Sequence, residues 1–144
     1  MHLPDTIPKP VTIFIIDDDE DDQLLLEEAL LSVNSDNTCF FCSDGIDGLK
    51  KLRGGILPRP DVIFADVNMP LLGGKQFLIQ IKKDPLFCAI PVIIYSTSSF
   101  ETEIKALIFL GAESFLKKPS DFNTLEESLH TILSALPDAK NTCS

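Results

Sequence analysis

Positive charge is scarce in this chain. Only 12 of its 144 residues are lysine or arginine, against 22 aspartates and glutamates, so the net charge is −10. A molecule this acidic repels phosphate backbones and anionic membrane surfaces. Direct binding to nucleic acid or to a membrane surface is therefore disfavoured as its function.

Long apolar runs are also missing. No segment approaches the ~20 apolar residues of a membrane-spanning helix, and the first ten residues, MHLPDTIPKP, lack the apolar stretch of a signal peptide. There are no internal repeats or low-complexity tracts. A chain of this length that is 44% hydrophobic can build one core of ordinary size, so we expect a single cytoplasmic domain.

Cysteine is present, but not in a pattern that indicates a metal site. Cys39 and Cys42 form a C-x-x-C spacing in TCFFC, and no second pair has the spacing of zinc ligands. The two phenylalanines between them indicate a strand, in which the two sulfurs would point to opposite faces. We therefore expect buried or half-buried thiols rather than a zinc or redox site.

The chain does contain a regular alternation of short β-branched runs with longer segments of helical period. Three runs, VTIFII, DVIFA and PVIIY, are continuously apolar, which is typical of strands buried on both faces of a parallel sheet. Helices should then cover both sides of that sheet, as in an α/β domain. The predicted domain spans residues 11–136, with strands at 11–16, 38–42, 61–65, 91–95 and 114–117, helices at 22–33, 44–52, 74–83, 100–110 and 121–136, and disordered tails at 1–10 and 137–144.

Polar side chains are found where the predicted strands end. Asp17 and Asp18 follow the first strand, Asp66 the third, Ser96 the fourth and Lys118 the fifth. Ligands of open α/β sheets bind beyond these carboxyl ends. Carboxylates bind Mg²⁺, and a carboxylate beside a metal ion can attack phosphorus to form an aspartyl phosphate. Because a lysine and a serine can hold phosphoryl oxygens, the set matches the needs of aspartyl phosphorylation.

Four segments, IIDDDEDD, PDVIFADVNMPLLGG, IPVIIYSTSS and LGAESFLKKP, give the chain a resemblance to the receiver domain of two-component response regulators. The resemblance covers residues 11–136 and implies a flavodoxin-like (βα)5 fold, with a doubly wound parallel five-stranded sheet of strand order 2-1-3-4-5. It implies a signalling module rather than an enzyme. A sensor histidine kinase or a histidine phosphotransfer protein would pass a phosphoryl group to this module in a Mg²⁺-dependent phosphorelay.

The resemblance also assigns roles to individual residues. Asp66 matches the phosphoacceptor, and Phe115 matches a switch aromatic, although it lacks the hydroxyl of the tyrosine often found there. A cis peptide bond is implied before Pro119. The Mg²⁺ ligands would be Asp17, Asp18, Asp66 and the backbone carbonyl of Asn68, and the phosphoryl group would be held by Ser96 and Lys118.

Three further acids of IIDDDEDD, namely Asp19, Asp21 and Asp22, have no matching role in the family. We interpret them as solvated residues that favour the start of the first helix, where negative charge meets the positive end of the helix dipole.

Two surfaces are candidate partner contacts. The adjacent leucines 24 to 26 span ~200° of a helix and cannot all face the core. At least one of these leucines should be exposed. It is either a single exposed apolar residue or, as the resemblance implies, part of a face of the first helix that docks a kinase helical bundle. The resemblance also allows a homodimer through the fourth helix, fifth strand and fifth helix, where most apolar side chains are expected in the core: Phe100, Ile104, Phe109 and Phe122.

The segments LRGGILPRPDVIFADVNMP and IKKDPLFCAIPVIIYSTSS are similar to those of stand-alone receivers, some of which serve phytochrome-type histidine kinases. No DNA-binding output domain is expected after the last helix. A shuttle in a phosphorelay and a regulator that acts by protein contact both fit this resemblance.

A phosphatase of the haloacid dehalogenase type is the main alternative from another class. It also forms an aspartyl phosphate with Mg²⁺, and Asp17-Asp18-Asp19 satisfies its D-x-D motif. Such an enzyme needs a further acidic metal motif after the lysine, where only 26 residues remain, and it gives Asp66 no role. A receiver that binds partners without phosphorylation ranks above the phosphatase and below a working receiver, because every position needed for the chemistry is present.

Overall fold

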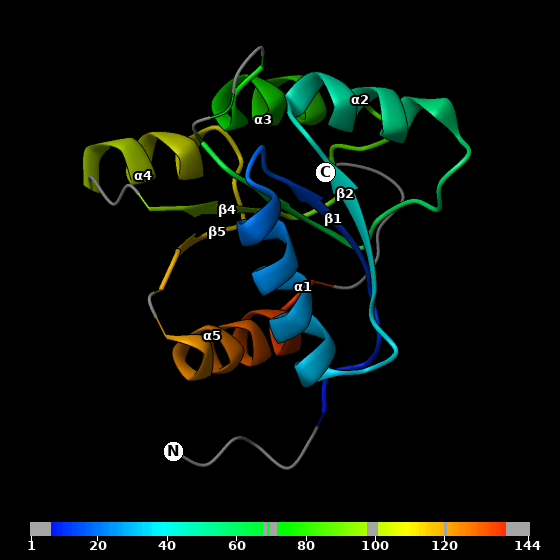
Figure 1. Cartoon of the computed structure of the whole chain (residues 1–144). Coiled ribbons are helices and arrows are strands. Elements are labelled where there is room, and N and C mark those ends of the chain that lie inside the picture. The colour runs from blue at the N-terminus through cyan, green and yellow to red at the C-terminus, as the bar shows by residue number, and fades with distance from the viewer. Residues whose placement is uncertain (1–6, 68, 70–71, 98–100, 120, 138–144) are drawn as a thin grey trace.

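A computed structural model describes residues 7–67, 69, 72–97, 101–119 and 121–137 of the chain (Figure 1). Strands and helices alternate along it, and every predicted element is confirmed with bounds that differ by no more than two residues. The strands are β1 (Thr12–Ile16), β2 (Thr38–Cys42), β3 (Val62–Ala65), β4 (Val92–Ser96) and β5 (Ser114–Lys117), and the helices are α1 (Glu20–Val33), α2 (Gly45–Gly54), α3 (Gly74–Lys83), α4 (Glu101–Phe109) and α5 (Phe122–Ser134).

The five strands form one parallel sheet. Their order is β2-β1-β3-β4-β5, which confirms the predicted order 2-1-3-4-5. Of the three inner strands, β3 and β4 are buried along their whole length and β1 at every residue but its first, whereas the edge strands β2 and β5 are partly exposed. Burial on both faces explains the continuous apolar runs of the inner strands, since neither face meets water.

Helices cover both faces of the sheet. Figure 1 shows α1 and α5 on one face and α2, α3 and α4 on the other. Successive strand residues point to opposite faces, so Phe14 and Ile16 pack in the core under α2 and α3, while Ile13 and Ile15 pack in the core under α1 and α5. The domain therefore has two apolar layers, one on each side of the sheet.

The register of the strands brings their carboxyl ends to one edge of the sheet. Ile16, the last residue of β1, pairs with Ala65, the last residue of β3. At the other side Ser96 of β4 pairs with Lys117 of β5. The residues that follow these positions, including Asp17 and Asp66, must consequently lie close together.

Helix α1 begins two residues before its predicted start. The carboxylate of Asp19 accepts hydrogen bonds from the backbone N–H of Asp21 at 2.9 Å and of Asp22 at 3.3 Å. This is the action of an N-cap residue, which satisfies donors that have no partner within the helix. The acids that follow Asp19 therefore belong to the first turn of α1 rather than to a loop.

Two predictions about exposed hydrophobic residues had different outcomes. Leu24 is 58% exposed and Leu25 36%, while Leu26 is buried, so the expectation of an exposed leucine on α1 is confirmed. The expectation that most apolar residues near α4 and α5 lie in the core is wrong for Phe109, which is 91% exposed, because it ends α4 and no element covers that face among the described residues. Ile104 and Phe122 are half-buried, and Phe100 lies outside the described residues.

The thiols of β2 lie as predicted. Cys42 is buried in the core under α2, Cys39 is half-buried in the core under α1, and both are free. Burial raises the pKa of both thiols to about 12, so neither is a reactive thiolate near neutral pH. None of the helices in the described part of the chain is long and apolar enough to cross a lipid bilayer.

Candidate phosphorylation site

Asp17 is fixed at the end of β1 by bonds to its backbone and side chain. Its N–H donates to the carbonyl of Cys42 at 3.0 Å, and its Oδ1 accepts from the N–H of Asp19 at 3.0 Å. The side-chain amide of Gln23 donates to the carbonyl of Asp17 at 2.6 Å and to that of Cys42 at 3.4 Å. The first turn of α1 thus holds the carboxylate of Asp17 in place.

Asp66 lies at the end of β3, directly beside Asp17. Its backbone N–H donates to the carbonyl of Ile16 at 3.0 Å, and the residue is buried. Helix α3 begins against its backbone, because a Cβ atom on Gly74 would overlap the carbonyl oxygen of Asp66. The N–H of Gly74 donates to the carbonyl of Val67 at 3.1 Å. Only glycine permits so close an approach of α3 to the loop that carries Asp66.

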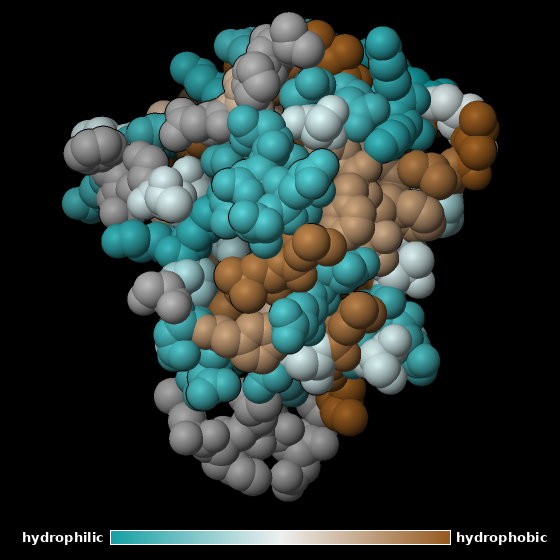
Figure 2. All heavy atoms as spheres, viewed as in Figure 1, coloured by the Kyte–Doolittle hydropathy of each residue, from teal (hydrophilic) through white to brown (hydrophobic). Residues whose placement is uncertain are grey.

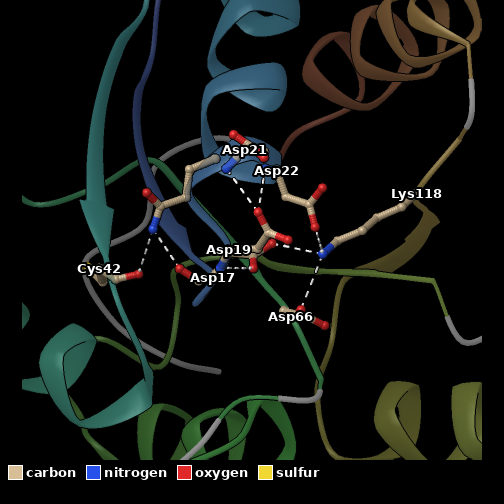
Figure 3. Close-up of polar contacts among 8 residues, drawn as sticks. Asp17, Asp19, Asp21, Asp22, Cys42, Asp66 and Lys118 are labelled. Carbon is tan, nitrogen blue, oxygen red and sulfur yellow. Dashed lines mark hydrogen bonds and ion pairs between the residues drawn. The ribbon is translucent and has the colours of Figure 1, made fainter.

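Lys118 reaches this carboxylate cluster from the end of β5. Its ammonium lies 2.9 Å from Oδ2 of Asp17, 2.7 Å from Oδ2 of Asp22 and 3.2 Å from Oδ2 of Asp66 (Figure 3). Its backbone N–H donates to the carbonyl of Ser96 at 2.9 Å. One lysine therefore joins the ends of β1, β3 and β5 with the first turn of α1.

Burial and charge shift the pKa values in the cluster. Burial raises the pKa of Asp17 above its usual value, and the hydrogen bond from Lys118 offsets only part of that effect. Burial alone would lower the pKa of Lys118, but the hydrogen bonds to Asp22 and Asp17 outweigh it and raise that pKa. The ammonium also lies 5.3 Å from the ring centroid of Tyr95, whose pKa burial raises to about 12. The site thus carries more negative charge than Lys118 neutralises.

The carboxylates are suitable ligands for a divalent cation. One oxygen each of Asp17, Asp18 and Asp66 lie within 4.8 Å of one another, with Asp18 exposed and the other two buried. Hard cations such as Mg²⁺ take one or two carboxylates and keep several waters. A cation here would be reachable from solvent through Asp18 and would offset the excess negative charge, so the residues present fit a divalent metal.

Comparison with known proteins identifies the family. Residues 13–130 match the family model of the response regulator receiver domain. The chain belongs to this family. Since the match spans most of the described fold, it confirms the resemblance drawn from the four segments and makes the protein a signalling module of two-component systems.

Individual relatives agree with this assignment. The receiver domain is 38% identical over 90 residues to the protein PilH of Pseudomonas aeruginosa, a match that covers 62% of this chain and 72% of PilH. It is 27% identical over 120 residues to the response regulator Rcp1 of Synechocystis sp., covering 81% of this chain and 82% of Rcp1.

Solved structures of related regulators share the fold. The Mn²⁺-bound form of Rcp1 is 27% identical, with a TM-score of 0.78 over 93% of this chain and 100% of that one. The phosphorylated cyanobacterial phytochrome response regulator RcpA is 27% identical, with a TM-score of 0.81 over 94% of this chain and 100% of that one.

Most of the predicted site residues of this receiver meet at the carboxyl edge of the sheet. Asp17, Asp18, Asp66 and Lys118 are in one cluster. Ser96 is buried as the last residue of β4, where its carbonyl accepts from Lys118. These positions come from four different elements of the sequence.

Among the remaining predicted residues, Phe115 lies apart from the cluster. Phe115 is half-buried on β5, opposite Ile94, and packs against the core under α3 and α4. Asn68 lies outside the described residues. Among those residues the chain has no cis peptide bond, so the bond before Pro119 is trans and the implied cis bond is not found. Trans is the ordinary preference of a bond before proline, by ~0.5–1 kcal/mol.

The interpretation of Asp22 as a solvated acid was wrong. Its carboxylate makes the shortest of the three contacts to Lys118, because α1 begins early enough to point it into the site (Figure 3). No local sequence signal singled out Asp22, because its partner Lys118 lies 96 residues away in the chain.

Proposed function

We propose that this receiver accepts a phosphoryl group on Asp66 from a histidine kinase or a histidine phosphotransfer protein, in a Mg²⁺-dependent reaction in the cytoplasm. One observation carries the proposal: the carboxylate of Asp66 lies both 3.2 Å from the ammonium of Lys118 and within 4.8 Å of the carboxylates of Asp17 and Asp18. A nucleophile, a phosphoryl-binding cation and a set of metal ligands thus share one edge of the sheet.

The residues of the chain have distinct tasks in this reaction. An oxygen of Asp66 forms a bond to phosphorus while the P–N bond of the donor phosphohistidine breaks and its electron pair stays on the imidazole. Lys118 donates a hydrogen bond to a phosphoryl oxygen, and the hydroxyl of Ser96 binds another. Asp17 and Asp18, with Asp66 and the carbonyl of Asn68, would hold Mg²⁺. When bound, Mg²⁺ supplies positive charge that reduces the repulsion between the carboxylate and the phosphoryl group.

The phosphorylated state is expected to differ from the resting state at β4 and β5. Ser96 would move toward the phosphoryl group, and the ring of Phe115 would turn inward. Because Phe115 has no hydroxyl, this part of the switch would rest on packing alone. The phosphoryl group can shift such an equilibrium only as far as its affinities for the two states differ.

Two exposed apolar surfaces support roles in partner contact. Figure 2 shows hydrophobic side chains gathered over α1, where Leu24 and Leu25 are exposed. We assign this face to docking of the phosphoryl donor. Phe109 and Ile108 of α4 are exposed near β5, which supports a homodimer through α4, β5 and α5. Sedimentation of the wild type and Phe109→Ser tests the dimer, which the substitution should weaken.

Known relatives support the chemistry. RcpA has been solved in a phosphorylated form, and Rcp1 with Mn²⁺ bound. Because RcpA is a phytochrome response regulator, we favour a phytochrome-linked phosphorelay as the pathway in which this chain acts.

Intact-protein mass spectrometry after incubation with acetyl phosphate tests the proposed reaction. The wild type and Asp66→Asn are incubated with and without Mg²⁺. We expect one phosphoryl adduct on the wild type that requires Mg²⁺ and is absent from the variant. No adduct on the wild type despite Mg²⁺ binding would instead favour a receiver that only binds partners, and an adduct that survives Asp66→Asn would point to Asp17 and a phosphatase.

A further inference from the structure

Asp22 has a place in the site that the phosphorylation chemistry does not explain. It comes from the first turn of α1, and its carboxylate lies 2.7 Å from the ammonium of Lys118, closer than Asp17 at 2.9 Å or Asp66 at 3.2 Å. We infer that Asp22 is a positioning residue that competes with the phosphoryl group on Asp66 for Lys118. This inference rests on the proposed phosphorylation of Asp66.

The competition follows from the number of donors on Lys118. A lysine ammonium has three N–H donors and no acceptor. Three carboxylate oxygens lie within reach of the ammonium of Lys118, so each donor already has an acceptor in the resting protein (Figure 3). A phosphoryl group on Asp66 adds oxygens that need a donor. Lys118 can serve them only if it gives up one of its present partners.

Asp22 is the partner that can be released at least cost. The side chain of Asp17 is 2% exposed, whereas that of Asp22 is 34% exposed. Once released, Asp22 can bind water, and it stays near the positive end of the α1 dipole, which stabilises its charge. Asp17 cannot turn to water in the same way, because its side chain is buried at the end of β1.

Removal of the charge of Asp22 should therefore make Lys118 more available to the phosphoryl group. In Asp22→Asn the rate constant for labelling Asp66 by acetyl phosphate should rise by about two- to tenfold, the lower part of the range that coupling between contacting residues spans. The variant Asp21→Asn is a matched control. Asp21 is the neighbouring acid in the same turn of α1 and is exposed. Its substitution removes the same charge from the same end of the helix without removing a contact to Lys118.

Lys118→Ala separates competition from simple charge repulsion. If Asp22 acts through Lys118, the excess of Asp22→Asn over Asp21→Asn should disappear in the Lys118→Ala background. The same excess in both backgrounds would overturn the inference, because Asp22 would then act only by repelling the anionic donor. Equal labelling rates for Asp22→Asn and Asp21→Asn in the native background would overturn it as well.

Urea unfolding of the same variants tests the ion pair without phosphorylation. Asp22→Asn should lower the urea midpoint when Lys118 is present and raise it in the Lys118→Ala background, where Asp22 only repels Asp17. An identical shift in both backgrounds would contradict the contact. A wild type that takes up no phosphoryl group on Asp66 would refute the proposed function, and the competition with it, even where unfolding reports the ion pair.

Discussion

Several carboxylates of the site lower the stability of the fold, because their arrangement suits the binding of a cation. The carboxylates of Asp17, Asp22 and Asp66 lie around the ammonium of Lys118, and the carboxylate of Asp18 lies beside those of Asp17 and Asp66. Ionisation of Asp17 is costly, since burial raises its pKa despite the bond to Lys118. Concentrated like charge of this kind is common where a protein binds a cation, and it lowers the stability of the unliganded fold.

Asp17→Asn should therefore stabilise the protein at neutral pH. We expect its free energy of unfolding in urea to exceed that of the wild type by about 1–2 kcal/mol, the usual scale of relief at a strained functional site. A carboxyl whose pKa is raised in the folded state contributes its full stabilisation below its ordinary pKa of 3.8 and loses that contribution as the pH rises through the raised pKa. The advantage of Asp17→Asn should accordingly shrink as the pH falls toward 4.

Added Mg²⁺ provides the control for this comparison. It should stabilise the wild type against urea much more than it stabilises Asp17→Asn, because one of the proposed ligands is missing from the variant. A variant that is less stable than the wild type at pH 7 without metal would show that the bond to Lys118 outweighs the cost of burying Asp17.

Sequence reasoning succeeded for some of these residues and failed for one. Asp17, Asp66 and Lys118 were predictable, because each directly follows a predicted strand and parallel strands end at a common edge. Asp22 was not found, since its partner lies 96 residues away and the run of acids offers several equivalent candidates. Only the exact start of α1 selects Asp22, and local composition does not set that start.

At the scale of elements, the site depends on how closely α3 approaches β3. The start of α3 packs against the backbone of Asp66, and Gly74 leaves no room for a side chain there. The position of Asp66 is thus determined by the helix behind it as well as by the strand before it.

Gly74→Ala should push the start of α3 away from Asp66. We expect it to lower the free energy of unfolding by about 1–3 kcal/mol, as for other overpacked positions, and to slow the labelling of Asp66 by acetyl phosphate. Gly54→Ala is the control: it lies at the end of α2 with open space where the Cβ would be, so it should leave stability unchanged or raise it slightly. Equal stability of the two variants would mean that the contact at Gly74 can relax.

Element types were predictable where the pattern was strong. The apolar runs of β3 and β4 indicated buried strands, and the helices between strands followed from their period. The start of α1 was misplaced by two residues because any of several adjacent acids could serve as its N-cap. The backbone conformation of these acids decides which of them is the N-cap, and that conformation depends on the rest of the fold.

At the scale of the whole molecule, the helical layers on the two faces of the sheet expose different apolar side chains. The layer with α1 presents Leu24 and Leu25 close to the site, while Ile56, which is 92% exposed, follows α2. The exposure of at least one of the leucines 24 to 26 was predictable from helix geometry, but not that Leu26 is the buried one. The exposure of Phe109 was not, because it depends on where α4 ends and on what packs beside it.

Leu24→Gln should impair transfer from a protein donor while sparing chemistry at Asp66. We expect phosphotransfer from phosphorylated histidine phosphotransfer proteins to slow by about fivefold or more, the effect of losing roughly 1 kcal/mol at an interface. Labelling by acetyl phosphate should stay unchanged, since a small donor does not contact α1. Ile56→Gln, an exposed apolar residue outside the proposed face, should change neither rate; slowing of both donors by Leu24→Gln would indicate a folding defect instead.

The site of phosphorylation can be located directly by chemical trapping. Borohydride reduces an acyl phosphate to an alcohol, so treatment of the labelled protein followed by peptide mass mapping marks the modified side chain. We expect conversion of Asp66 to homoserine, in wild-type protein incubated with acetyl phosphate and Mg²⁺ and in no sample lacking Mg²⁺. Conversion of Asp17 or Asp18 with Asp66 intact would contradict Asp66 as the phosphoacceptor.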